Sequence, residues 1–206
     1  MERQKKVRVT KIQIIVLFLT IAYIIAFGTY YLMAQNYEFL FYVVILVALT
    51  AFVSALHLRF NFSTLVLIGA SIWGFMHMAG GSFRIAGDRL YGYIILPIAS
   101  STSAAGTDIF RFDQFAHFYC YIVVTVMLFY ITKPYLKEKV NGFSLSVLLF
   151  FMGMGVGALN EFFEFLPVLF LDNTGVGGYY NTLWDIVFNG IGALTAVIYL
   201  KLNKKL

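Results

Sequence analysis

The chain has little charge and almost no cysteine, and both shortages narrow what it can be. Charged residues make up 12% of its 206 residues, about half the share of a typical soluble domain. Hydrophobic residues make up 61%, more than a soluble globule of this size can bury, so most of that surface must face lipid. The one cysteine, Cys120, excludes an internal disulfide.

The net charge of +5 does not indicate nucleic acid as a partner. The basic residues lie in short clusters beside apolar runs, where they act as orientation signals and contact anionic headgroups. We therefore expect membrane lipids as partners and no nucleic acid.

A helix needs about 20 apolar residues to cross a bilayer. Five stretches meet that length, and a sixth, residues 64–79, is shorter and can span together with its flanks. The six are residues 12–34, 38–57, 64–79, 113–132, 144–166 and 182–200. The first follows a basic segment like that of a signal peptide, but it is too long for one and no cleavage site follows. The sequence predicts an all-α, polytopic membrane helical bundle that forms one domain over residues 1–206.

The distribution of lysine and arginine predicts the orientation of this bundle. With the N-terminus inside, twelve of the fifteen basic residues fall on the cytoplasmic side and three on the outside. Such a bias is the positive-inside signal. We therefore predict that both termini are cytoplasmic and that the long loop over residues 80–112 is external. Within it, residues 91–99 are too short to span and contain Pro97, which indicates an interfacial or re-entrant segment.

Polar side chains occur inside four of the six apolar stretches, always toward the predicted outer end. They are His77, Asp113, His117, Glu161, Glu164, Asp185 and Asn189. Helical periodicity places them on faces that also carry small residues, such as Gly153 and Gly157. Small residues mark helix–helix contacts in membranes, so these polar faces are expected to point into the bundle.

Ionisable groups inside a membrane are costly and usually functional, and facing carboxylates repel unless something neutralises them. A divalent metal is the economical neutraliser. Mixed nitrogen and oxygen ligands suit Zn, Mn or Fe, whereas carboxylates alone suit Mg or Ca. We expect the ligands to be Asp113, His117, Glu161 and Asp185. Glu164 or His77 would then serve as general base or acid, with Asn189 orienting a ligand.

A purely structural network is the alternative, in which hydrogen bonds among these side chains fix the helix packing and some carboxylates are protonated. A lone Asp-x-x-x-His or Glu-x-x-Glu pair does not distinguish the two readings. Both remain open at the level of sequence.

The predicted outer loops supply candidate substrate-binding groups. Arg84, Arg89 and Arg111 are the three external basic residues, and arginine suits phosphate or carboxylate groups. Tyr179 and Asn181 lie at the mouth of the last helix, which Asn181 or Thr182 could cap. Together they predict an anionic lipid headgroup or lipid-linked substrate. Simple pairing of the arginines with Asp88 and Asp108 is the alternative.

Four motifs occur in a recognisable order. They are MHMAGG around His77, RFDQFAHF around Asp113 and His117, NEFFEF at 160–165, and GYYNTLWDIVFNGIGA at 178–193. Over residues 64–200 the chain resembles the YjdF-like family of predicted inner-membrane proteins and, more distantly, VanZ-like proteins.

This resemblance implies a small multi-pass protein of the prokaryotic plasma membrane but supplies no reaction. VanZ-like sequences often carry Lys after the aspartate and Glu-x-x-Gln in the following helix. Here those positions hold Gln114 and Glu164, so the site is more acidic than theirs.

Three functions are compatible with these residues. The leading hypothesis is a metal-dependent hydrolase or transferase that acts on lipid headgroups at the outer leaflet. A proton-coupled transporter or permease would instead titrate the carboxylates during passage. A non-catalytic, lipid-binding accessory protein would use the polar residues only for packing.

Overall fold

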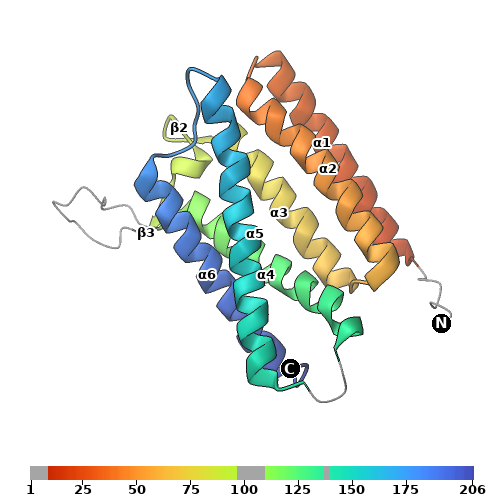
Figure 1. Ribbon diagram of the computed structural model, residues 1–206. Coiled ribbons are helices and arrows are strands. Elements are labelled where there is room, and N and C mark those ends of the chain that lie inside the picture. Colours follow the sequence, from red (N-terminus) through yellow and green to blue (C-terminus); the bar gives the residue numbers. More distant parts are fainter. Residues whose placement is uncertain (1–8, 97–109, 137–139) are drawn as a thin grey trace.

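The computed structural model describes residues 9–96, 110–136 and 140–206, and within these ranges it contains six long helices (Figure 1). They are α1 (Lys11–Met33), α2 (Tyr37–Phe60), α3 (Thr64–Ser82), α4 (Phe112–Thr132), α5 (Gly142–Phe170) and α6 (Tyr179–Leu202). Each is long and apolar enough to cross a membrane, which confirms the predicted all-α, multi-pass fold. α3 continues three residues past its expected end, to Ser82, which makes it long enough to span.

Local side-chain caps explain where several helices begin. Thr10 and Gln13 form a reciprocal capping box at the start of α1, with contacts of 3.3 and 2.9 Å. Asn36, Ser63 and Asn141 accept hydrogen bonds from the first turns of α2, α3 and α5. Such caps satisfy backbone N–H groups that have no partner inside the helix.

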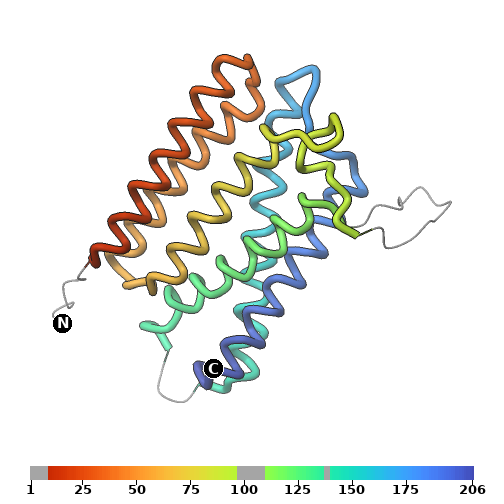
Figure 2. The backbone as a smooth tube through the Cα atoms, turned by 180° about the vertical axis from the view of Figure 1, so that it is seen from behind, coloured from red at the N-terminus to blue at the C-terminus, as the bar shows by residue number. Residues whose placement is uncertain are grey.

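The helices form two groups of three that meet where α3 packs against α4 (Figures 1 and 2). α1 packs against α2 and α3, whereas α4 packs against α5 and α6. The first and last described residues lie at the same end of the bundle (Figure 1), which we call the terminal end. The opposite end, which carries the α3–α4 and α5–α6 loops, we call the loop end.

Glycine allows the helices of the second group to approach closely. A Cβ atom at Gly192 of α6 would collide with the backbone carbonyl of Phe118 in α4. A Cβ at Gly153 of α5 would lie 2.7 Å from Thr125 Oγ1 and 3.0 Å from the Cβ of Ala193. Small residues serve this purpose at membrane helix contacts in general. The three helices can therefore bring their side chains together at one point.

The α3–α4 loop contains short strands where an interfacial or re-entrant segment was expected. β1 (Arg84–Ile85) pairs with β2 (Asp88–Arg89), and after the 3₁₀ turn η1 (Leu90–Gly92) strand β3 (Ile94–Leu96) pairs with β4 (Phe110–Arg111). β4 satisfies backbone groups of β3, so residues 94–96 do not form a re-entrant helix, and the interfacial alternative stays a prediction. Pro97, Ala99 and Asp108 lie outside the described residues.

Candidate functional site

His117 of α4 is the centre of a group of carboxylates at the loop end. Its Nε2 lies 3.6 Å from Glu164 Oε1, 3.7 Å from Asp113 Oδ1 and 4.0 Å from Asp185 Oδ1. Its Nδ1 lies 3.5 Å from Glu161 Oε1. We call Asp113, His117, Glu161, Glu164 and Asp185 the acidic cluster. Its side chains come from α4, α5 and α6.

Amide side chains hold the acidic cluster in place. Gln114 Nε2 and Asn181 Nδ2 each donate to Asp185 at 2.7 Å, and Asn181 Nδ2 also donates to Asp113 Oδ2 at 3.1 Å. Asn189 Oδ1 lies 3.0 Å from His117 Nδ1. Asp185, Asn189 and Gln114 are almost completely buried. A polar frame this buried fixes the positions of the carboxylates that it contacts.

The contact between His117 and Asn189 orients the imidazole ring of His117. The amide oxygen of Asn189 accepts, so Nδ1 carries the proton and donates to it. Nε2 faces the oxygen atoms of Asp113, Glu164 and Asp185, where it either donates a proton to a carboxylate or, when unprotonated, offers a lone pair to an ion. Metal-binding histidines are usually oriented in this way through their second nitrogen.

Four members of the acidic cluster each offer one ligand atom, and these atoms lie within 4.8 Å of one another. They are His117, Glu161, Glu164 and Asp185. Three of them were expected as ligands from the sequence. Glu164 takes the place expected for Asp113, whose Oδ2 is engaged by Asn181.

Two observations fit a cation among these atoms. Glu161 Oε1 is buried and accepts no hydrogen bond from any described residue, although a buried carboxylate oxygen without a partner is costly. The cluster also contains four carboxylates, which outnumber a protonated His117 and the nearby Arg111 guanidinium even when both are counted. A divalent ion, or protonation of two of the carboxylates, would balance the remaining negative charge.

Gly157 of α5 makes room for the amide that orients His117. A Cβ at Gly157 would lie 3.0 Å from Asn189 Nδ2 and 3.3 Å from the Cβ of Asn189. One turn further along the same face of α5 comes Glu161. The glycine therefore lets α5 approach α6 at the point where the cluster forms.

His77 of α3 lies apart from the ligand group, in an aromatic pocket. Its ring stacks on Trp73 at 5.5 Å between centroids and meets Tyr42 edge-on at 5.3 Å. Its Nδ1 lies 2.5 Å from the Tyr91 hydroxyl, which also donates to the His77 carbonyl at 3.0 Å. Burial raises the pKa of Tyr91 well above its ordinary value, so this loop residue keeps its proton and holds His77 in place.

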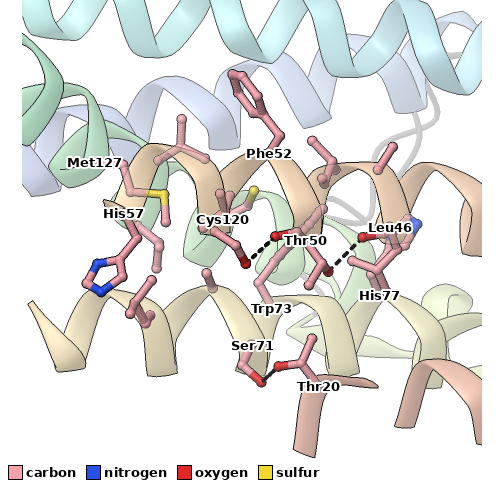
Figure 3. Close-up of a pocket in the computed structure, with 18 of the residues that line it drawn as sticks. Thr20, Leu46, Thr50, Phe52, His57, Ser71, Trp73, His77, Cys120 and Met127 are labelled. Carbon is pink, nitrogen blue, oxygen red and sulfur yellow. Dashed lines mark hydrogen bonds between the residues drawn. The ribbon is translucent and has the colours of Figure 1, made fainter. Parts of the chain in front are cut away.

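A cavity of about 590 Å³ joins these two regions. Its walls include His77, Cys120 and Glu164, and it runs toward the terminal end as far as His57. Figure 3 places His77 and His57 at opposite ends of it. Asn160, which donates to Glu164 Oε1 at 2.8 Å, also lines the cavity.

Of the predicted substrate-binding residues, Arg84 and Arg89 make contacts elsewhere, whereas Arg111 and Asn181 lie beside the acidic cluster. Arg84 donates to the Gly87 carbonyl within its own turn at 3.0 Å, and Arg89 pairs with Glu38 of α2 at 3.3 Å instead of with Asp88. Arg111 directly precedes α4, the helix that carries Asp113 and His117 of the acidic cluster. Asn181 contacts the cluster, whereas the side chain of Tyr179 is exposed.

The N-cap expectation for α6 was wrong. Gly178 occupies that position, because Asn181 lies inside the first turn and uses its side chain to contact Asp113 and Asp185. The tertiary contact therefore takes the side chain that could have capped the helix.

Sequence reasoning missed two residues that contact the cluster, Gln114 and Asn160. Gln114 is adjacent to Asp113 and therefore lies about 100° away from it on an ideal helix, so periodicity did not select it. The backbone N–H of Arg111, three residues earlier, donates to Gln114 Oε1 at 3.1 Å. Asn160 is four residues before Glu164, and that spacing was the signal that could have identified it.

Comparison with known proteins agrees with the membrane fold and adds no reaction. No curated protein and no solved structure matches the chain. A family model described as "Predicted membrane protein (DUF2238)" matches residues 12–205, nearly the whole chain. The chain therefore belongs to this family of predicted membrane proteins.

Proposed function

We propose that the protein is a metal-dependent membrane enzyme that acts on the anionic headgroup of a lipid or lipid-linked molecule. The observation that carries the proposal is the convergence of four ligand atoms from three helices within 4.8 Å. The buried oxygen of Glu161 makes no hydrogen bond with any described residue and its neighbour His117 Nδ1 is 3.5 Å away, which supports a cation as a closer partner.

In this proposal His117, Glu161 and Asp185 hold the ion, and Asn189 orients His117. Three protein ligands leave a coordination position open for a substrate, as in catalytic zinc sites. A bound divalent ion polarises a substrate oxygen and lowers the pKa of bound water. The mixed nitrogen and oxygen ligand set suits Zn, Mn or Fe, whereas Mg would be held by the carboxylates.

Glu164 is the proposed general base. Its carboxylate belongs to the ligand group, accepts a hydrogen bond from Asn160 at 2.8 Å, and also lines the cavity. It therefore borders both the ion and the space that a substrate would occupy. Arg111, at the start of α4, is placed to contact an anionic group entering from the loop end. With both termini in the cytoplasm, that end faces the outer leaflet of a prokaryotic plasma membrane.

Elemental analysis of the purified protein tests this proposal. Wild type is expected to carry near-stoichiometric divalent metal, and the variants Glu161→Gln and Asp185→Asn are expected to lose it. Glu38→Gln is the matched control, because Glu38 is a buried carboxylate of α2 that pairs with Arg89. Metal-free wild type that stays folded, and that does not gain stability when metal is added, would overturn the proposal.

A structural polar network is the second candidate, favoured by the hydrogen bonds that Gln114 and Asn181 make to Asp185. In that case a chelator leaves the thermal unfolding temperature unchanged, whereas a ligand that binds only the folded state raises it. A proton-coupled permease would instead require flux driven by a pH gradient and lost in Glu164→Gln.

A further inference from the structure

We infer that the cavity behind the acidic cluster binds the single hydrocarbon chain of a membrane amphiphile, whose anionic head reaches Glu164 and His77. This inference rests on the proposed function for the head of the molecule. The part of the inference that concerns the hydrocarbon chain rests on the cavity alone.

The cavity is long and crosses much of the membrane thickness. Tyr42 and His57, which line it, are separated by fifteen residues of α2, or about 22 Å at 1.5 Å per residue. The apolar core of a bilayer is about 30 Å thick. The cavity volume of about 590 Å³ lies within the range of roughly 300–1,000 Å³ that is usual for ligand pockets. Its shape therefore suits one extended chain.

The middle of the cavity suits hydrocarbon because the serine and threonine hydroxyls of its walls are already bonded. Thr50 and Ser54 donate to the carbonyls of Leu46 and Thr50, each at 2.7 Å. Thr20 donates to the Val16 carbonyl at 2.8 Å, and Ser71 is 2.7 Å from Thr20, a contact drawn in Figure 3. A wall whose polar atoms are satisfied internally offers little to water or ions and does not penalise methylene groups.

One polar atom at the loop end of the cavity has no partner. The Tyr42 hydroxyl is buried and makes no hydrogen bond with any described residue. Its ring lies 5.3 Å from that of His77, beside the part of the wall that Asn160 and Glu164 form. A buried hydroxyl in this position requires an acceptor, and the head of a bound amphiphile would supply one.

The cavity also has a route for entry from the bilayer. Phe52 of α2 and Leu159 of α5 line it, yet more than half of each side chain is exposed. These side chains lie on the apolar outer surface of the bundle, which faces lipid. A chain can therefore slide in sideways between α2 and α5 while its head remains near the loop end.

Photocrosslinking with hexadecyl phosphate that carries a diazirine in mid-chain tests the inference in detergent-solubilised full-length protein. Peptide mapping is expected to locate the label on cavity-lining segments of α2, α3 and α4. Ala48→Trp and Ala70→Phe place bulk in the cavity, because both alanines line it. Each is expected to reduce labelling at least tenfold. Ala51→Trp is the matched control, since Ala51 is an exposed α2 residue outside the cavity lining.

Label spread evenly over lipid-facing residues, or unchanged by both cavity substitutions, would overturn the inference. Metal analysis of the same samples separates its failure from that of the proposed function. A metal-loaded protein without cavity labelling refutes the chain site alone. Cavity labelling in a protein without metal supports the chain site and refutes the metal-dependent reaction.

Discussion

Each end of the bundle buries a histidine, but the groups around the two imidazole rings differ. At the loop end His117 has four carboxylates within 4.0 Å and an amide oxygen at 3.0 Å. Toward the terminal end His57 is equally buried, but neither ring nitrogen makes a hydrogen bond with a described residue, and its ring lies 6.2 Å from that of Phe62. Burial alone therefore does not identify a site. What distinguishes His117 is that carboxylates from three helices converge on it.

The same contrast appears in the helix packing. Around the cluster, glycines of α5 and α6 allow close approach to α4, whereas α2 and α5 stand apart along the cavity. The close contact builds a polar site and the wider spacing leaves an apolar space. The following predictions test that comparison, from the largest expected effect to the smallest.

The largest effect is expected from Gly192→Ala. The new Cβ would collide with the backbone carbonyl of Phe118, which cannot move without shifting α4, so the variant should lose about 3 kcal/mol of unfolding free energy. Thermal or denaturant unfolding in detergent measures this loss. Gly155→Ala is the control, because nothing lies within 4 Å of that position, and equal stability of the two variants would contradict the packing described for α4 and α6.

Asp185→Ala should follow, with a loss of about 2 kcal/mol. It removes the acceptor of two 2.7 Å hydrogen bonds and leaves the amides of Gln114 and Asn181 with only their longer contacts, 3.3 Å to Asn181 Oδ1 and 3.1 Å to Asp113 Oδ2. Unfolding measurements beside Asp172→Ala, at an exposed aspartate of the α5–α6 loop, separate this effect from loss of charge. A loss no greater than that of the control would show that the amide frame is not essential.

Arg89→Ala should cost about 1 kcal/mol or less. Its partner Glu38 is buried, but the arginine side chain is 37% exposed, and exposed ion pairs contribute little. Glu38 also keeps its hydrogen bond from the Gly175 backbone at 2.8 Å. Unfolding in low and high salt measures the contribution, which should shrink as salt rises. A larger loss that does not depend on salt would indicate that Arg89 supports the loop by packing.

The smallest change is expected from His57→Phe. It removes two buried nitrogen atoms that lack partners, so the unfolding free energy should stay the same or rise by up to about 1 kcal/mol. His117→Phe, the matched substitution in the cluster, should instead destabilise the protein and abolish metal binding. Loss of stability in His57→Phe comparable to that in Asp185→Ala would mean that His57 has a partner.

Much of the fold could be predicted from the sequence because the bilayer imposes it. A run of about 20 apolar residues must form a helix in lipid, and the six predicted stretches correspond to α1–α6. The end of α3 and the strands of the α3–α4 loop could not be predicted in this way. Their backbone hydrogen bonds join residues such as Ile94 and Arg111, which are far apart in the sequence.

For the candidate site, helical phase indicated which side chains share a face, and the structure brings Asp113, His117, Glu161, Glu164 and Asp185 together. Helical phase could not show which of these five side chains lie closest to one another. Only the packing of α4, α5 and α6 shows that Glu164 belongs to the ligand group and Asp113 does not, and that Gln114 and Asn181 donate hydrogen bonds to Asp185.

By itself the sequence determined a multi-pass helical membrane protein with polar residues inside its spans, because hydropathy and helical period are properties of single segments. The tertiary structure alone decided the meeting point of those residues, the isolation of His77 beside Tyr91, and the cavity between the two groups of helices. Each of these depends on the distance between helices, which side-chain volume at the contacts sets and which no single segment encodes.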